Sequence, residues 1–320
     1  MDTRHLVDPE LAATLEQFPP LVLTPEILPQ VRAISAEQFA QMRTMLPTFP
    51  EITVDERRVP GPAGAPEVRV LVYRPQSAGQ QLPALLWIHG GGYVLGSADQ
   101  DDIQAKSLAT AVGCVVVSVD YRLAPETPYP GPVEDCYAAL TWLHTSAAEL
   151  GVNPQRIAIG GASAGGGLAA GLGLLARDRG AVPVAFQLLI YPMLDDRTVT
   201  TADPHPHTGE FIWTHDANRF GWASLLGSEP GGADVAPYAA AARATRLAGL
   251  PPTYLCVGAL DLFLEEDLEY ARRLMRDGVP TELHVYPGAY HGFNMAPDAQ
   301  VSRAFTRDLT DALRRALQAA

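Results

Sequence analysis

A single serine, Ser163, stands among glycines in the segment RIAIGGASAGGGLAAG, which covers residues 156–171. Residues 157–159 are typical of a short buried strand, and leucines recur at helical spacing after the serine. A tight turn from strand to helix needs small neighbours, which Gly161 and Gly165 supply, and it pushes the central hydroxyl outward. Because a helix N-terminus favours negative charge, the segment predicts a nucleophilic serine, with a glycine-rich phosphate-binding turn as the alternative.

Activation of that hydroxyl requires a base that takes its proton and a carboxylate that orients the base. In an α/β sheet such residues follow the carboxyl ends of strands. The strand-like run TYLCVGAL ends at Asp261, and the run ELHVYPG is followed by AYHGF, which contains His291. The chain order Ser163, Asp261, His291 at three successive strand ends matches the arrangement of α/β hydrolases, and it predicts a catalytic triad.

Plainer interpretations exist for the two partners of the serine. Asp261 could cap the helix that follows it, and His291 could be a loop histidine bonded to a backbone carbonyl. Three further carboxylates compete with Asp261, namely Glu265, Glu266 and Asp267. We expect these three to be solvated surface charges, because they lie in the helix beyond the turn.

A second glycine-rich segment, WIHGGGYVLGS at residues 87–97, follows another apolar strand-like run. Three consecutive glycines let backbone N–H groups face a ligand that side chains would block. Donors placed there would stabilise the oxyanion of acyl transfer and lower the barrier by several kcal/mol, on the order of 3. A flexible loop and a phosphate-binding loop are the alternatives. No Lys-Ser/Thr pair follows these glycines and no G-x-G-x-x-G opens a helix, which disfavours phosphate.

The elements that must position these residues form an alternating pattern. From about residue 52, Val/Ile/Leu-rich runs alternate with helical patterns, which predicts a mostly parallel sheet with helices on both faces. Residues 1–50 are helical pieces broken by prolines, and residues 195–247 contain helical fragments without a clear strand. We therefore predict an N-terminal cap segment at 1–50, a first part of the catalytic core at 51–194, a cap insertion at 195–247 and a second part of the core at 248–320.

Composition excludes several classes of function. A chain of 320 residues, 47% of them hydrophobic, can bury one large core. Its net charge of −13 argues against a nucleic-acid or anionic-membrane partner and favours a neutral or cationic substrate. The chain shows no signal-peptide pattern and no membrane span. Cys114, Cys136 and Cys256 lie in or beside apolar runs, so we expect buried free thiols in a reducing cytoplasm.

Six motifs together resemble the hormone-sensitive-lipase-like family of bacterial carboxylesterases, within the α/β hydrolases. They are HGGGY, DYRLAPETPYPGPVED, GASAGG, YPMLDD, GALDLFLEED and YHGF, and the match runs from about residue 66 to the carboxyl terminus. The resemblance implies an α/β-hydrolase fold whose mostly parallel sheet is flanked by helices, with a helical cap from the N-terminus and a mid-chain insertion. It also implies that Ser163 is the nucleophile, His291 the base and Asp261 its orienting acid.

The same resemblance assigns the oxyanion-hole amides to Gly91, Gly92 and Ala164, and it makes His89 a residue that fixes the loop. The chain departs from the family pattern at two places. Many members carry an acidic residue before the nucleophile, where this chain has Ala162. Many also show Asp-x-Leu-x-Asp where this chain has DLFLE. We expect the first change to alter the support of the active-site loops and to leave catalysis intact.

These observations predict a serine carboxylesterase that cleaves short- to medium-chain acyl esters of small molecules through an acyl-enzyme. The substrate pocket is assigned to Tyr93, Tyr191, Met193, Phe211, Ile212 and Trp213, although the cap aromatics could equally serve to pack the cap. No metal or organic cofactor is implied, and His205 and His207 are interpreted as cap residues.

Three alternatives and one assembly state stay open from the sequence. The enzyme could instead be an amidase, or a deacetylase of a specific small molecule. A non-catalytic ligand-binding protein on the same fold is disfavoured because His291 is present. An open sheet also leaves an edge strand on which a homodimer could form.

Overall fold

The computed structural model describes residues 2–18, 21–42, 47–76, 79 and 81–318. Its centre is an eight-stranded sheet in the order β1-β2-β4-β3-β5-β6-β7-β8. The strands are β1 Ile52–Val59, β2 Val68–Pro75, β3 Leu82–Ile88, β4 Val115–Asp120, β5 Val152–Ala162, β6 Phe186–Ile190, β7 Thr253–Gly258 and β8 Thr281–Tyr286. In the described sheet β2 pairs antiparallel with β1 and β4, and the other pairs are parallel. The mostly parallel sheet predicted from the sequence is therefore confirmed.

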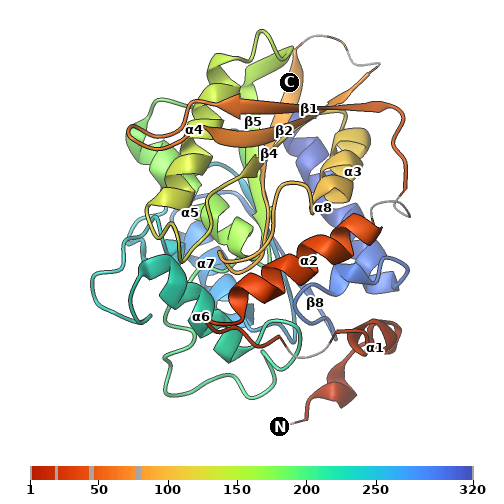
Figure 1. The fold of residues 1–320 in the computed structure, drawn as a ribbon, viewed down its shortest axis with the longest axis vertical. Helices are drawn as coiled ribbons and strands as arrows, with labels where there is room; N and C mark the ends of the chain where they lie inside the picture. The colour runs from red at the N-terminus through yellow and green to blue at the C-terminus, as the bar shows by residue number, and fades with distance from the viewer. Residues whose placement is uncertain (1, 19–20, 43–46, 77–78, 80, 319–320) are drawn as a thin grey trace.

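Helices cover both faces of this sheet (Figure 1). One face carries α4 Gly131–Thr145, α5 Ala164–Arg179 and α7 Leu264–Arg276, and the other carries α3 Asp102–Val112 and α8 Gln300–Gln318. Side chains of β3 alternate between the two layers: Leu86 and Ile88 join one hydrophobic cluster, while Leu85 and Trp87 join the other. Burial on both faces explains why the central strands are apolar without interruption.

The N-terminal segment and residues 195–247 add helices outside the sheet layers. They contain η1 Arg4–Leu6, α1 Pro9–Leu15, α2 Leu28–Met42, α6 His215–Leu226 and η3 Ala241–Arg243. In Figure 1, α1, α2 and α6 all lie below β1 and β2. On α2, Arg32 donates to the carbonyls of Val94 and Ala124, at 2.8 and 2.7 Å, which ties this helix to the chain that follows the HGGG loop. The four-part domain division remains a prediction.

Among the described residues, no helix combines the length and the apolar character that crossing a bilayer requires. The three cysteines are buried and unpaired, as the sequence predicts.

Candidate active site

Ser163 lies at the turn between β5 and α5, with φ 57° and ψ −122°. A non-glycine residue in this region of backbone space is strained and is held there by its surroundings. The two flanking glycines make the turn sterically possible. A Cβ on Gly161 would lie 2.5 Å from the carbonyl carbon of Gly165, and a Cβ on Gly165 would lie 2.0 Å from the Ile88 oxygen. The close approach of these backbones explains why both positions are glycine.

The three predicted triad residues form a continuous chain of hydrogen bonds. The Ser163 Oγ lies 2.9 Å from the His291 Nε2, and the His291 Nδ1 lies 2.8 Å from the Asp261 Oδ2. Ser163 and His291 are each 7% exposed, and Asp261 is fully buried. The other oxygen of Asp261, Oδ1, accepts the Phe263 amide at 3.0 Å, so the carboxylate both stabilises its own turn and orients the histidine.

Aromatic side chains surround the His291 ring. The ring centroids of Tyr191 and Phe263 lie 4.8 and 5.2 Å away in edge-on arrangements, and that of Trp213 lies 6.5 Å away. The indole N–H of Trp213 donates to Asn218 on α6 at 3.0 Å, which links this aromatic wall to the 195–247 segment. Packing on several sides restricts the imidazole to the orientation that its two hydrogen bonds require.

The HGGG loop brings free amide groups to the serine. Gly91 and Gly92 have φ values of 111° and 60°, and both line the same cavity as Ser163. Within the described part of the chain, the N–H groups of these two glycines donate no hydrogen bond to another residue. Ala164 is the first residue of α5, where an amide has no partner in its own helix. Three unused donors therefore lie in the segments that flank the serine hydroxyl.

His89 holds the start of this loop. Its Nδ1 lies 2.8 Å from the Gly90 carbonyl, and its ring stacks on Tyr121 at 4.2 Å between centroids. The Tyr121 hydroxyl donates to the His89 carbonyl at 3.0 Å. Burial lowers the pKa of His89, so the ring is neutral at physiological pH. These contacts match the loop-fixing role that the resemblance implies, and none of them reaches Ser163.

A cavity of about 340 Å³ opens beside Ser163 and His291. Of the six residues that the sequence assigned to the substrate pocket, Tyr191, Ile212 and Trp213 line it. Trp213 packs so closely on the loop that a Cβ on Gly92 would lie 2.0 Å from its ring. The wall is therefore built partly from the segment 195–247.

The structure places the other three predicted pocket residues elsewhere, which corrects that part of the assignment. Tyr93 is fully buried, and its hydroxyl donates to the Met193 carbonyl at 3.0 Å. Met193 is itself fully buried, and the ring of Phe211 packs edge-on against Tyr290 at 6.2 Å. These side chains join the loops around the site to the core, so packing occupies the apolar surface that a substrate would need.

Among the lining residues that the sequence did not assign to the site are Leu21, Ser35, Leu95, Gln100, Asp101 and Met295. Leu21 and Ser35 come from the N-terminal segment, which the sequence predicts to be part of a cap without indicating which of its residues face the site. Asp101 is the acid of this wall. The acids Asp99, Asp101 and Asp102, which follow the glycine-rich segment 87–97, were the available signal.

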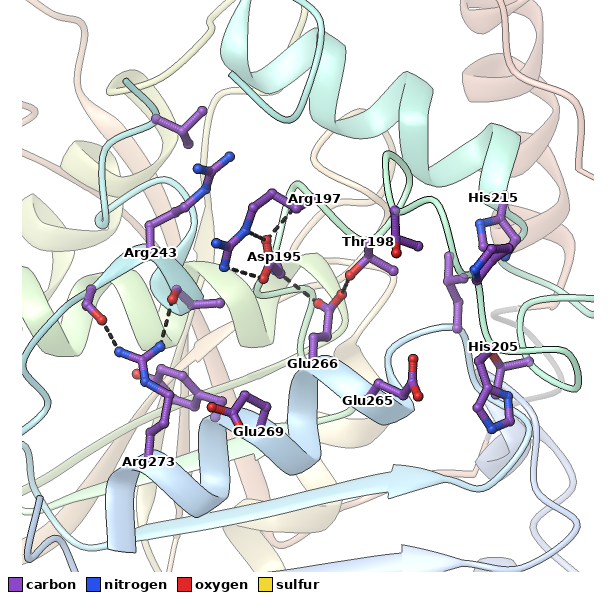
Figure 2. A pocket seen from close by; sticks show the side chains of 18 of the residues that line it. Asp195, Arg197, Thr198, His205, His215, Arg243, Glu265, Glu266, Glu269 and Arg273 are labelled. Atoms are coloured by element: carbon purple, nitrogen blue, oxygen red, sulfur yellow. Dashed lines mark hydrogen bonds and ion pairs between the residues drawn. The ribbon is translucent and has the colours of Figure 1, made fainter. Parts of the chain in front are cut away.

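The expectation that Glu265, Glu266 and Asp267 are all solvated is wrong for two of the three. Glu265 is exposed, but Glu266 and Asp267 are buried, at 8% and 0% exposure. Glu266 accepts the amides of Leu194 and Asp195 at 2.6 and 3.1 Å. It also accepts the Thr198 hydroxyl (Figure 2).

Glu266 is buried because α7 packs against residues 194–198. Burial raises the pKa of Glu266, although these hydrogen bonds partly oppose the shift. Asp267 has no hydrogen-bond partner among the described residues, and burial raises its pKa well above its ordinary value.

A larger cavity, about 680 Å³, lies between α7 and the 195–247 segment (Figure 2). It is polar, and its arginines are already engaged: Arg197 pairs with Asp195, and Arg243 pairs with Asp196. Neither Ser163 nor His291 lines it.

Across the described residues no group of three or more His, Cys, Asp and Glu side chains could hold a metal ion, His205 and His207 included.

Comparisons with known proteins agree with this geometry. A family model described as alpha/beta hydrolase fold matches residues 85–295. Carboxylesterase NlhH of Mycobacterium tuberculosis (strain ATCC 25618 / H37Rv) is 36% identical over 98% of this chain and 97% of its own. Esterase LipI of the same strain is 33% identical over 91% of this chain and 89% of its own.

Two solved structures extend this agreement to three dimensions. Bacterial Heroin Esterase superposes with a TM-score of 0.94 at 44% identity, over 99% of this chain and 100% of that one. Esterase LipW from Mycobacterium marinum superposes with a TM-score of 0.88 at 35% identity, over 99% and 98% of the two chains. The resemblance drawn from the sequence motifs is thus confirmed, and the chain belongs to the alpha/beta hydrolase fold family.

Proposed function

We propose that the protein is a serine carboxylesterase that cleaves esters of small molecules through an acyl-enzyme. The observation that carries the proposal is the hydrogen-bonded chain Ser163, His291, Asp261, with distances of 2.9 and 2.8 Å. The carboxylesterases and esterases to which the chain is similar support the same reaction.

Acylation begins when the Ser163 Oγ attacks the carbonyl carbon of the ester and His291 Nε2 takes the hydroxyl proton. Asp261 holds the Nδ1 proton and stabilises the imidazolium that forms. The amides of Gly91, Gly92 and Ala164 donate to the oxyanion of the tetrahedral intermediate. His291 then gives its proton to the leaving alcohol, and the acyl group stays on the serine oxygen.

Deacylation uses the same groups in the same roles. His291 Nε2 takes a proton from water, and the resulting hydroxide attacks the acyl carbon. The second tetrahedral intermediate collapses, the carbon–oxygen bond to Ser163 breaks, and the serine oxygen recovers its proton from His291. The carboxylic acid leaves and the free enzyme is restored.

The size of the cavity supports short and medium acyl chains. A volume of about 340 Å³ lies near the lower end of the range for small-molecule pockets, roughly 300–1,000 Å³. Leu21 from the N-terminal segment and Trp213 from the 195–247 segment both contribute to its wall. We propose that these two segments form the cap, and a long acyl chain would have to displace it.

Hydrolysis of p-nitrophenyl esters from acetyl to palmitoyl tests this proposal. We expect kcat/KM to peak at a short or medium chain and to fall at least about 1,000-fold in Ser163→Ala, because the nucleophile is lost. Ser107→Ala on α3 is the matched control and should keep the wild-type rate. Negligible rates for wild type and Ser163→Ala alike would refute the esterase and favour an amide substrate.

We also propose a cytoplasmic location, because the three cysteines are buried and free. Titration of the denatured protein, purified without reductant, should detect three thiols, and fewer would contradict a reducing compartment.

A homodimer through an edge of the sheet is proposed on the grounds that β1 and β8 are each paired on one side only in the described sheet.

A further inference from the structure

A small second cavity, about 130 Å³, adjoins the catalytic cavity. The two cavities share three lining residues, Asp101, Ala162 and Tyr191. Ala162 is the position directly before Ser163. Ala162 has only a methyl side chain, so Asp101 is the acidic residue of the three that the two cavities share.

Asp101 stands out among the neighbouring acids because no cation neutralises it. Asp99 pairs with Arg69 at 2.6 Å, and Asp102 pairs with Lys106 at 2.6 Å. Asp101 enters none of the ion pairs of the described residues, and its Oδ2 accepts one hydrogen bond, from the Trp87 indole N–H at 2.6 Å. Its remaining lone pairs have no donor among the side chains and amides that the structure describes.

The surroundings compensate that charge only in part. Asp101 is half-buried, and burial raises its pKa although His89 and the Trp87 N–H oppose the shift. The charge of Asp101 raises the pKa of His89, but burial outweighs it and lowers that pKa, which disfavours a charged imidazolium beside Asp101. A positively charged ligand beside Asp101 would relieve this cost.

Aromatic side chains complete the small cavity. Trp87, Tyr191 and Phe305 line it together with Asp101. A carboxylate with several aromatic rings is the combination that proteins use for ammonium groups, because ring faces and carboxylate both attract the cation. The net charge of −13 attracts cations to the molecule as a whole.

We propose that Asp101 is a specificity-determining residue that binds an ammonium group of the ester substrate, at the wall between the catalytic cavity and the aromatic side cavity. The inference rests on the proposed function, because it names the class of ester that the same site prefers. The ammonium group would lie in the acid or the alcohol half of the ester, within reach of Asp101 while the carbonyl carbon lies at Ser163.

Inhibition by tetramethylammonium tests the proposal without assuming which half carries the charge. Hydrolysis of p-nitrophenyl acetate is measured with tetramethylammonium chloride against sodium chloride at equal ionic strength. We expect competitive inhibition in the wild type and in the control Asp102→Asn. In Asp101→Asn the inhibition constant should rise about tenfold, equivalent to about 1.4 kcal/mol. Equal inhibition constants in the three proteins, or no inhibition of the wild type, would overturn the proposal.

A second measurement needs no variant and remains decisive if Asp101→Asn does not fold. Acetylcholine and 3,3-dimethylbutyl acetate have the same shape and differ by one positive charge. We expect the wild type to favour the charged ester in kcat/KM, and equal or reversed values would count against an ammonium site. Should the wild type hydrolyse no ester, the proposed function fails. Calorimetric titration with tetramethylammonium would then decide the role of Asp101 alone.

Discussion

Two buried carboxylates near Ser163 and His291 differ in the hydrogen bonds that they accept. Asp261 is buried but accepts hydrogen bonds from His291 and from the Phe263 amide. Asp267 lies six positions further on, equally buried, and has no partner among the described residues. The first carboxylate is held by two hydrogen bonds, whereas burial and the charges of Glu266 and Asp261 raise the pKa of the second and favour its neutral form.

This difference predicts how Asp267 affects stability with pH. Below about pH 4 both the folded and the unfolded states hold the proton, so the group costs nothing. As pH rises, the unfolded state ionises while the folded state keeps its proton, and the free energy of unfolding falls. Relative to Asp267→Asn, the wild type should lose up to about 1.4 kcal/mol of stability per pH unit above pH 4.

Urea unfolding of both proteins between pH 4 and pH 8 measures this effect. Asp203→Asn, at an exposed position, is the control and should follow the wild type at every pH. A difference between wild type and Asp267→Asn that does not vary with pH would show that Asp267 is ionised in the folded state.

At the scale of elements, one side chain joins α7 to the chain that leaves β6. Glu266 accepts the amides of Leu194 and Asp195 and the Thr198 hydroxyl, so three donors depend on one buried carboxylate. The same helix follows the turn that holds Asp261. Loss of this anchor should therefore weaken the fold and disturb the position of the triad acid.

We expect Glu266→Ala to lower the free energy of unfolding by about 2–3 kcal/mol, because buried donors would be left unpaired. Its neighbour Glu265 is exposed, so Glu265→Ala should change stability by less than about 0.5 kcal/mol. Urea unfolding at pH 7 compares the two, and similar losses would contradict the anchoring role of Glu266.

The sequence predicted the strands well because their signal is local. Runs such as CVVVSV lie on β4, and their continuous apolar character follows from burial on both faces. The helix α3 was not predicted, although its buried residues Ala105, Leu108, Ala109 and Val112 recur at helical spacing. Glu266 was misjudged because it binds residues 194–198, some 70 positions away, and no local pattern records that contact.

The same contrast between local signals and long-range contacts applies to the candidate site. The serine turn, the glycine loop and the carboxyl ends of strands have local signatures, and the structure brings Ser163, Asp261 and His291 within hydrogen-bond distance. The cavity wall depends on how segments distant in sequence meet. Leu21 and Asp101 face one cavity although they are far apart along the chain, so only the folded structure identifies them.

At the scale of the whole molecule, the two edges of the sheet differ in character. The middle of β1 is exposed and carries Asp55, Glu56, Arg57 and Arg58, and such charges oppose edge-to-edge pairing. The strand β8 is mostly half-buried, and Val285 is its exposed apolar residue. The proposed homodimer would therefore form through β8.

Light scattering with size-exclusion chromatography should find a dimer for the wild type and a monomer for Val285→Lys, because a lysine on an edge strand disfavours pairing. Val54→Lys on β1 is a matched control, since Val54 and Val285 are both 41% exposed. A monomeric wild type would refute the dimer, and dissociation by Val54→Lys alone would move the interface to β1.

The residues of the proposed triad come from widely separated parts of the chain: His291 lies 128 positions after Ser163 and 30 after Asp261. His291 follows β8 in the chain. During synthesis on the ribosome Ser163 therefore emerges long before His291. A nascent chain that has completed β5 and α5 still lacks this histidine, so ester cleavage cannot begin until β8 and the segment after it have been made.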